Sequence, residues 1–438
     1  MKNSFKILLI LSVVLLILSC NTTEPPQPEK TIKLELEDTA SIEAWIKITT
    51  NNIQLPATVT LNKSAEGGNA VAQDIILSTA DSVVYIDSLL PKTTYTFQAS
   101  IHTNIQTYKS NELSVTTMDT TSHNFTWQSW TFGEHSSSVL FDVAVIDENN
   151  IWAVGEIYMN DSLGNPDPHA YNAVHWDGQE WKLYRIMFYT ICGQSHKTPY
   201  PAKSIFAFNK TDIWIAMDGD QIARLNDTTQ TNIMCLPFSF VINKLWGSSA
   251  NDMYAVGNNG NIARWNGTRW IKLFNNGTDL NFYDILGAKN KDDEFTIYTI
   301  AANISSSFDK MILNINSLNP VNTDGIPYSI HGIWFKNKVF YVVGSGMYKK
   351  YNITSSLEWE AIHHGITNYY LSSINGNDLN DIAACGAFGE LLHFNGYNWK
   401  SYQNIFNGTA LGKVTIKNNL VVAVGFNSSK AFITIGRR

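Results

Sequence analysis

A motif of about 40 residues recurs along the C-terminal three hundred residues of this chain, and it constrains the fold more than any other feature. The clearest copy runs from Lys244 to Trp270 and divides into four strand-length runs separated by Gly, Asn and Asp turns. A second copy runs from Ser373 to Trp399. Each copy therefore has the content of one four-stranded antiparallel sheet.

Seven copies can be aligned on two positions. The first run of each copy holds an aliphatic residue at the same place, namely Val143, Ile205, Leu245, Ile285, Ile333, Ile374 and Val414. Four of the six intervals between them are 40 or 41 residues long. The second run holds an aromatic residue in five copies, at Trp152, Trp214, Tyr254, Tyr298 and Tyr341. The pattern predicts a seven-bladed β-propeller over residues 125–438, with six or eight blades as alternatives if the weak fourth copy, residues 285–316, is misaligned.

The two ends of this region are each incomplete. The last copy, from Val414 to Gly436, has room for three strands only, while the run Phe125–Phe132 precedes the first copy without neighbours of its own. Trp130 matches the tryptophan of the outer strand, which other copies place at Trp181, Trp270, Trp359 and Trp399. We therefore expect the two ends to share one blade, because this arrangement closes the ring and removes an exposed sheet edge.

The repeat resembles that of bacterial propellers whose units read Trp-Gly, Asn-Asp-x-Tyr-Ala-Val-Gly and Trp-Asn-Gly-x-x-Trp. Here these motifs are Trp246-Gly247, residues 251–257 and residues 265–270. The resemblance implies a secreted or lipid-anchored protein and no particular activity. The repeat is also distantly similar to the Asp-box of sialidases, but Asp177 and Asn266 come directly before Gly and the Ser of that box is missing.

An all-β domain of another kind is predicted for residues 31–118. Alternating runs such as residues 82–86 and 113–117, separated by turn residues, predict a β-sandwich. Residues 90–97 resemble the tyrosine corner of fibronectin type III domains, which implies that the Tyr95 hydroxyl bonds to the backbone upstream. Such domains are usually spacers. The polar residues 119–124 predict a hinge.

The N-terminus carries the features of a secretion signal. Lys2 and Lys6 precede an apolar run over residues 7–18, which is too short to span a bilayer. Residues 17–20, Ile-Leu-Ser-Cys, resemble the lipobox of bacterial lipoproteins, which implies removal of residues 1–19 and lipidation of Cys20. An ordinary signal that ends near a cysteine is the alternative. The proline-rich residues 20–30 would then form an extended tether between lipid and protein.

This reading predicts a lipid-anchored protein of a bacterial cell envelope, at the outer membrane or the cell surface, with the inner membrane as the alternative. Three more cysteines follow in an oxidising compartment. Cys192 and Cys235 lie in adjacent segments and could form a disulfide, whereas Cys385 replaces a core valine of the repeat. We expect a monomer attached to the membrane only through its lipid.

Several function classes are disfavoured. The 31 basic against 38 acidic residues give a formal charge of −7, which argues against nucleic acid as a partner. A sialidase needs a cluster of arginines, and the six arginines of this chain do not occupy inner-strand positions. The ten histidines lack the spacing of paired metal ligands, so we expect no metal and no cofactor.

Surface recognition remains, and two groups of residues are candidates for it. The position before the aliphatic register would line the channel mouth, and it places Asp142, Lys244, Asp284 and Lys413 there as binding residues. The insertion 156–171 and the loop 189–200 lie on the same face of the predicted ring. They supply the other candidates, Tyr158, His169, Tyr171, Tyr189, His196 and Tyr200.

Both groups have structural alternatives, since the charged residues could merely solvate a channel and the loops could merely cap a blade. We expect a binding or scaffold lipoprotein whose propeller face recognises a protein or a glycan. The alternative is a carbohydrate-active enzyme, a glycoside hydrolase or lyase, built on the same scaffold. No catalytic residues are assigned.

Overall fold

The computed structural model describes residues 29–103, 106–273, 277–290, 293–303 and 308–438. The signal segment 1–19, Cys20 and most of the tether lie outside the described residues. The chain divides into two units, with the boundary between Thr117 and Met118. In the described part of the chain, no helix has both the length and the apolar character needed to cross a membrane.

The first unit consists of two antiparallel sheets. One holds β1 (Thr31–Thr39), β2 (Ala44–Asn51) and β5 (Asp81–Ile86). The other holds β4 (Val71–Leu77), β3 (Ala57–Ala65), β6 (Thr94–His102) and β7 (Thr107–Lys109) in that order, with β8 (Leu113–Thr116) also paired to β6.

Alternate residues of the two sheets form a single apolar core, as period-two patterning predicts. Ile46, Ile48 and Phe97 are completely buried in it. The hydroxyl of Tyr95 accepts a hydrogen bond of 2.9 Å from the backbone N–H of Leu90. The bond that the tyrosine-corner motif implies is thus present.

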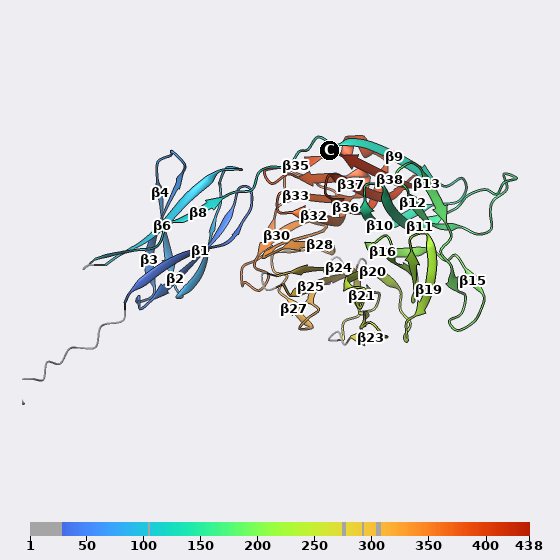
Figure 1. The fold of residues 1–438 in the computed structure, drawn as a ribbon, viewed down its shortest axis with the longest axis horizontal. Coiled ribbons are helices and arrows are strands. Elements are labelled where there is room, and N and C mark those ends of the chain that lie inside the picture. Colours follow the sequence, from blue (N-terminus) through green and yellow to red (C-terminus); the bar gives the residue numbers. More distant parts are fainter. Residues whose placement is uncertain (1–28, 104–105, 274–276, 291–292, 304–307) are drawn as a thin grey trace, which may run out of the picture. The chain divides into compact units, whose positions relative to one another are not determined.

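The second unit is a β-propeller, built in its described residues from seven four-stranded antiparallel sheets (Figure 1). In chain order, these sheets are β10 (Val139–Asp147), β11 (Asn150–Ile157), β12 (Tyr171–Trp176) and β13 (Trp181–Tyr184); β16 (Ala202–Asn209), β17 (Asp212–Met217), β18 (Gln221–Asn226) and β19 (Thr229–Cys235); β20 (Ile242–Ser249), β21 (Asp252–Gly257), β22 (Ile262–Trp265) and β23 (Trp270–Leu273); β24 (Asn281–Lys289), β25 (Phe295–Ala302), β26 (Lys310–Asn314) and β27 (Asn319–Val321); β28 (Ile330–Lys336), β29 (Val339–Gly344), β30 (Gly346–Tyr351) and β31 (Glu360–Ala361); β32 (Leu371–Asp378), β33 (Asp381–Gly386), β34 (Leu391–Phe394) and β35 (Trp399–Ser401); and β36 (Thr409–Lys417), β37 (Leu420–Asn427), β38 (Lys430–Arg437) and β9 (Thr126–Phe132).

Smaller elements decorate these sheets. They are the hairpin β14 (Phe188–Tyr189) and β15 (Lys197–Thr198), the 3-10 turn η1 (Ala387–Gly389) and the short helix α2 (Gln403–Phe406).

The first strands of the seven sheets stand side by side around a central axis. Each first strand packs against the first strand of the next sheet, and β36 of the last sheet packs against β10 of the first. The aliphatic residues of the first register are all buried, as expected. Lys417 joins the last sheet to the first by donating to the carbonyl of Val145 at 3.1 Å.

The expected pairing of the two ends is confirmed. Strand β9 pairs antiparallel with β38 and places Trp130 opposite Ile433. The Trp130 ring also lies 5.6 Å from that of Trp176 and 5.8 Å from that of Trp181 in the first sheet. One strand from the start of the unit therefore completes the last sheet and covers its edge.

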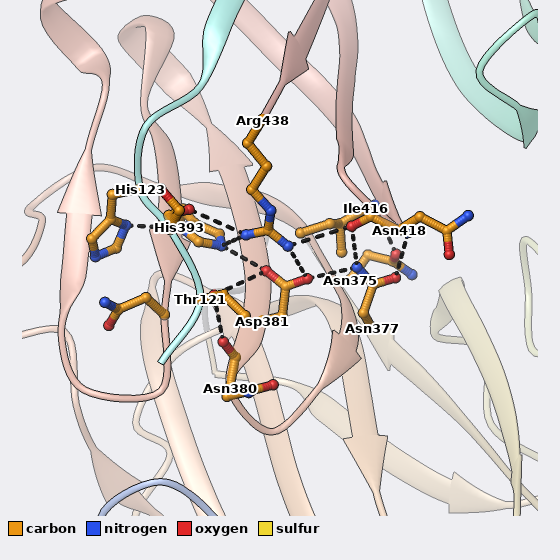
Figure 2. A network of polar contacts seen from close by, with 12 residues as sticks. Thr121, His123, Asn375, Asn377, Asn380, Asp381, His393, Ile416, Asn418 and Arg438 are labelled. Atoms are coloured by element: carbon orange, nitrogen blue, oxygen red, sulfur yellow. Dashed lines mark hydrogen bonds and ion pairs between the residues drawn. The ribbon is translucent and has the colours of Figure 1, made fainter. Parts of the chain in front are cut away.

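A cluster of buried polar groups fixes this closure (Figure 2). The Asp381 carboxylate at the start of β33 accepts hydrogen bonds from Arg438 Nη2 at 2.6 Å and from His393 Nε2 at 2.8 Å. His393 Nδ1 in turn lies 2.8 Å from His123 Nδ1. Burial lowers the pKa of both histidines, which favours their neutral forms.

Residues 119–124, expected as a hinge, are hydrogen-bonded to the turn before β33, next to Asp381. Thr121 Oγ1 donates to the carbonyl of Asn380 at 2.8 Å, and Asn380 Nδ2 donates to the carbonyl of Asp119 at 2.8 Å. This segment is therefore part of the propeller unit and leads directly into β9.

In the second and third sheets, the aromatic residue of the second register lies beside an ion pair of the same kind. Asp212 lies 2.6 Å from Arg224, whose guanidinium covers the ring of Trp214 at 4.5 Å. Asp252 and Arg264 repeat this pair at 2.7 Å, with the guanidinium over the Tyr254 ring. The Asp and the aromatic residue of the motif thus hold a cation of the third strand within one sheet.

We predict that Asp381→Asn destabilises the propeller by about 3 kcal/mol, because it leaves the buried guanidinium of Arg438 without a counter-charge. Denaturant unfolding followed by tryptophan fluorescence measures this loss, since every tryptophan except Trp45 lies in the propeller unit. The control is Asp293→Asn in the exposed pair with Lys289, which should not change stability. Equal stability of the two variants would contradict this account of ring closure.

Candidate functional site

An irregularity repeats at the start of every first strand. In all seven sheets the pairing between first and second strands shifts by one residue, for example between Leu140 and Asp142 in β10. The residues skipped by these shifts are Phe141, Lys203, Asn243, Tyr283, His331, Ser372 and Gly412. A bulge turns a side chain away from its regular direction, so seven bulges redirect one residue from each sheet.

The seven bulged residues line one cavity at the axis. The cavity has a volume of about 470 Å³ and also touches apolar residues such as Leu411 and Phe426. It lies at the starts of the first strands, which form one face of the propeller. We call it the mouth cavity.

Glycines in the second strands make room for these bulges. A Cβ on Gly257 would lie 1.9 Å from the carbonyl oxygen of Val241, and a Cβ on Gly155 would lie 2.0 Å from that of Val139. Gly344, Gly386 and Gly425 show the same close approach. The glycine that ends the second run of the motif is therefore required by the backbone of the neighbouring strand.

Aromatic rings form much of the wall of the mouth cavity. The rings of Tyr283 and His331 stack at 4.5 Å, and the ammonium of Lys203 lies 4.1 Å from the centre of the Phe141 ring. His331 Nδ1 lies 2.8 Å from the carbonyl of Ser372 and must carry the proton in that bond, because a carbonyl can only accept. Burial lowers the pKa of His331, so its imidazole is neutral at physiological pH.

Two ion pairs form the floor of the mouth cavity. Lys244 Nζ lies 2.6 Å from Asp142 Oδ2, and Lys413 Nζ lies 2.9 Å from Asp284 Oδ1. These are the four charged residues that the sequence places at the position before the aliphatic register. Both carboxylates are almost completely buried. The second pair joins the last sheet to the fourth, across the axis.

Hydrogen bonds satisfy the remaining capacity of Asp142. Its carboxylate accepts from Ser204 Oγ at 2.8 Å, from the backbone N–H of Ile205 at 2.9 Å and from its neighbour Val143 at 3.0 Å. Burial by itself would raise the pKa of Asp142, but the ammonium groups of Lys244 and Lys413 hold it below its usual range. Burial by itself would lower the pKa of Lys413, but the carboxylates of Asp284 and Asp142 raise it above its usual value. The Asp142 carboxylate and the Lys413 ammonium are therefore charged at neutral pH.

A second cavity of about 200 Å³ lies along the axis beyond the floor. Lys244 and Lys413 line both cavities. The two ion pairs thus form a partition that divides the channel.

The sequence therefore identified the floor of the site and missed its walls. The four charged residues are brought together, but they neutralise one another below the mouth. The residues that line the walls stand one position before that of the charged residues in each copy. In a regular strand, neighbouring side chains point to opposite faces, so alternation would place these residues away from the cavity. The only sequence feature that pointed to these wall residues was the glycine of the second strand, because it makes room for the bulge.

The six loop residues do not assemble into one site, and none of them lines the mouth cavity. Tyr158 bonds to Glu156, and Arg185 covers the Tyr171 ring at 3.9 Å. Tyr189 lies beneath the ammonium of Lys197, and Tyr200 packs against the core between the first two sheets. His169 and His196 are exposed.

These loops are held in place by their own contacts. Arg185 Nη2 binds Asp167 at 2.5 Å and the carbonyl of His169 at 2.8 Å. Cys192 forms a disulfide with Cys235 at the end of β19. Cys385 is a buried free thiol, in keeping with its core position.

Four of the six arginines are engaged in ion pairs within the protein. Arg224, Arg264 and Arg438 serve the ion pairs of the sheets, and Arg185 serves the loop. Within the ranges that the structure describes, no three His, Cys, Asp or Glu side chains are placed to hold a metal ion.

Comparisons with known proteins show no family for this chain. No family model and no curated protein matches the chain. Among solved structures, the chain is similar to the WD40 β-propeller domain of Doa1, with 12% identity and a TM-score of 0.46 over 71% of this chain and 97% of that chain.

Two other solved propellers are similar to a comparable extent. The Cps50 (Swd1) β-propeller domain of Myceliophteria thermophila shows 10% identity and a TM-score of 0.48 over 70% of this chain and 99% of that chain. The Pan2 WD40 domain of Neurospora crassa shows 7% identity and a TM-score of 0.46 over 70% and 95%.

We predict that Lys244→Met lowers the free energy of unfolding by about 3 kcal/mol, because it leaves the Asp142 carboxylate buried without its cation. The double variant Asp142→Asn with Lys244→Met should recover part of this loss, since no charge remains unpaired. Denaturant unfolding measures both effects. The control is Lys203→Met, which removes a mouth lysine without breaking an ion pair; a similar loss in this control would contradict the assignment of Lys244 to the floor.

Proposed function

We propose that this chain is a lipid-anchored binding protein of the bacterial cell envelope, whose propeller presents the mouth cavity to a protein or glycan ligand. The observation that carries the proposal is the mouth cavity itself. Each of the seven sheets interrupts its regular pairing to bring one residue to the cavity, and six of these residues carry a side chain, the seventh being Gly412. Bulges at equivalent positions are features that a fold retains for a purpose, commonly next to a site.

The proposed architecture has three parts. The propeller has seven blades, with β9 and β38 completing the last one. The first unit is a fibronectin type III-like sandwich that acts as a spacer, which the bond between Tyr95 and Leu90 supports. Residues 20–30 tether this spacer to lipid on Cys20.

A binding role is favoured over a carbohydrate-active enzyme. Glycoside hydrolysis needs two carboxyl groups free to donate a proton and to act as base or nucleophile. The carboxylates nearest the mouth, Asp142 and Asp284, are each paired with a lysine. Such groups serve structure rather than proton transfer.

We predict that Phe141→Ala and Tyr283→Ala each weaken ligand binding by tenfold or more, because their rings form the wall of the mouth cavity. Binding is measured on a glycan array and on purified envelope proteins, and the affinity of each hit is then compared between variants. The loop variants Tyr158→Ala and Tyr189→Ala are matched controls on the same face and should bind within twofold of the wild type. Loss in the loop variants alone would move the site away from the mouth cavity.

We also predict that Cys20→Ser releases the protein from the membrane, because acyl chains provide the apolar area that holds a soluble body at a bilayer. Partition of expressed protein between membrane and soluble fractions, and into detergent, measures the change. The neighbouring substitution Asn21→Ser is the control and should leave the protein in the membrane fraction. Membrane retention of Cys20→Ser would exclude the lipid anchor.

A further inference from the structure

The charges around the mouth cavity do not balance. On the floor, the two lysines and the two aspartates pair with one another. Lys203 is a fifth charged residue at the mouth, and in the described part of the chain it forms no ion pair. The mouth therefore carries one excess positive charge, although the whole chain has a formal charge of −7.

The position of Lys203 suits the capture of an anion. It is the bulged residue of β16, so its side chain is turned into the mouth cavity. Its ammonium lies over the Phe141 ring and is half-buried, where an opposite charge is attracted more strongly than in open water. The imidazole of His331 is neutral, so Lys203 is the group that attracts an anion by its charge.

The walls beside Lys203 are apolar. Leu140, Phe141, Leu411 and Phe426 line the cavity, and Phe426 keeps 42% of its surface exposed. An exposed apolar surface inside a concave site gains free energy when an apolar group covers it. A ligand for this cavity thus joins a negative charge to an apolar group.

Two of the polar side chains on the lining are already engaged in hydrogen bonds within the protein. Asn243 Nδ2 donates to Asn258 at 2.7 Å and to the carbonyl of Phe282 at 2.9 Å. His331 Nδ1 is bound to the carbonyl of Ser372. A peptide with an apolar side chain matches this lining better than a glycan does.

The closed floor limits which part of a ligand can enter. A cavity of about 470 Å³ that ends at two ion pairs admits the end of a chain but not its passage. A peptide whose last residue is apolar carries a carboxylate and an apolar side chain on that same residue.

We propose that the mouth cavity binds the free carboxylate of an apolar acid, with Lys203 as its counter-ion and Phe141, Leu411 and Phe426 around the apolar group. The macromolecular form of this ligand is the carboxyl end of a protein whose last residue is large and apolar. This inference rests on the proposed function, because it names the ligand class of the same site.

The test uses peptides attached to a surface through their N-termini, with random sequences that end in Phe, Leu, Ile or Val. Each peptide is presented as the free acid and as the C-terminal amide. We expect the wild-type protein to bind free acids at least tenfold more tightly than amides. Lys203→Met should reduce this preference to less than twofold, because the apolar wall remains and the charge is lost. Lys210→Met is the control, since Lys210 is exposed on the turn at the other end of β16.

Competition by 3-phenylpropionate distinguishes the two sources of the carboxylate. Displacement by micromolar 3-phenylpropionate would support a small free acid as the ligand. Displacement only by peptides with a free carboxylate would support the carboxyl end of a protein. Either result supports an apolar carboxylic acid as the ligand class. Equal binding of acids and amides, no binding of either, or an unchanged preference in Lys203→Met would overturn the inference.

The proposed function fails by a different result. Binding of a glycan that Phe141→Ala abolishes, with no binding of peptides, would preserve the mouth cavity as the site and overturn only the ligand class. Binding of any ligand that is indifferent to Phe141, Tyr283 and Lys203 would overturn both.

Discussion

The pairing of β9 with β38 is the contact on which the rest of the propeller depends. A ring of sheets that is left open has two free edges, and its inner strands have no fixed distance across the axis. The cluster around Asp381 supports this pairing from the neighbouring sixth sheet, where Asp381 of β33 and His393 of β34 meet Arg438 and the segment before β9. Because the ring is closed, residues from sheets far apart in the sequence reach one another in the channel, as Lys413 reaches Asp284.

Much of the fold could be predicted because one sheet is repeated. The aliphatic register, the aromatic register and the final glycine each follow from contacts within a blade or between neighbours, and those contacts depend on local spacing. Trp214 above Arg224 and Gly257 beside the Val241 carbonyl are examples. The shared last blade was also predictable, since the lone strand with Trp130 had no other edge to pair with.

The site was only partly predictable, because its geometry depends on the closed ring and on bulges. The sequence placed Asp142, Lys244, Asp284 and Lys413 in one layer of the channel, but not the pairing between them, which depends on distances across the axis. Phe141, Lys203 and Tyr283 escaped notice because a bulge reverses the direction that strand alternation assigns to a side chain. The loop tyrosines were conspicuous in sequence, yet each packs locally.

The partition across the channel has a consequence for longer molecules. Two ion pairs lie across the channel, with a separate cavity beyond them. A polymer therefore cannot thread through the ring. The channel also cannot connect the two faces of the propeller. If the mouth cavity binds a partner as proposed, it engages that partner at a terminus or at a projecting group. The number of such termini, rather than the length of the partner, then determines how many copies of this protein it can recruit.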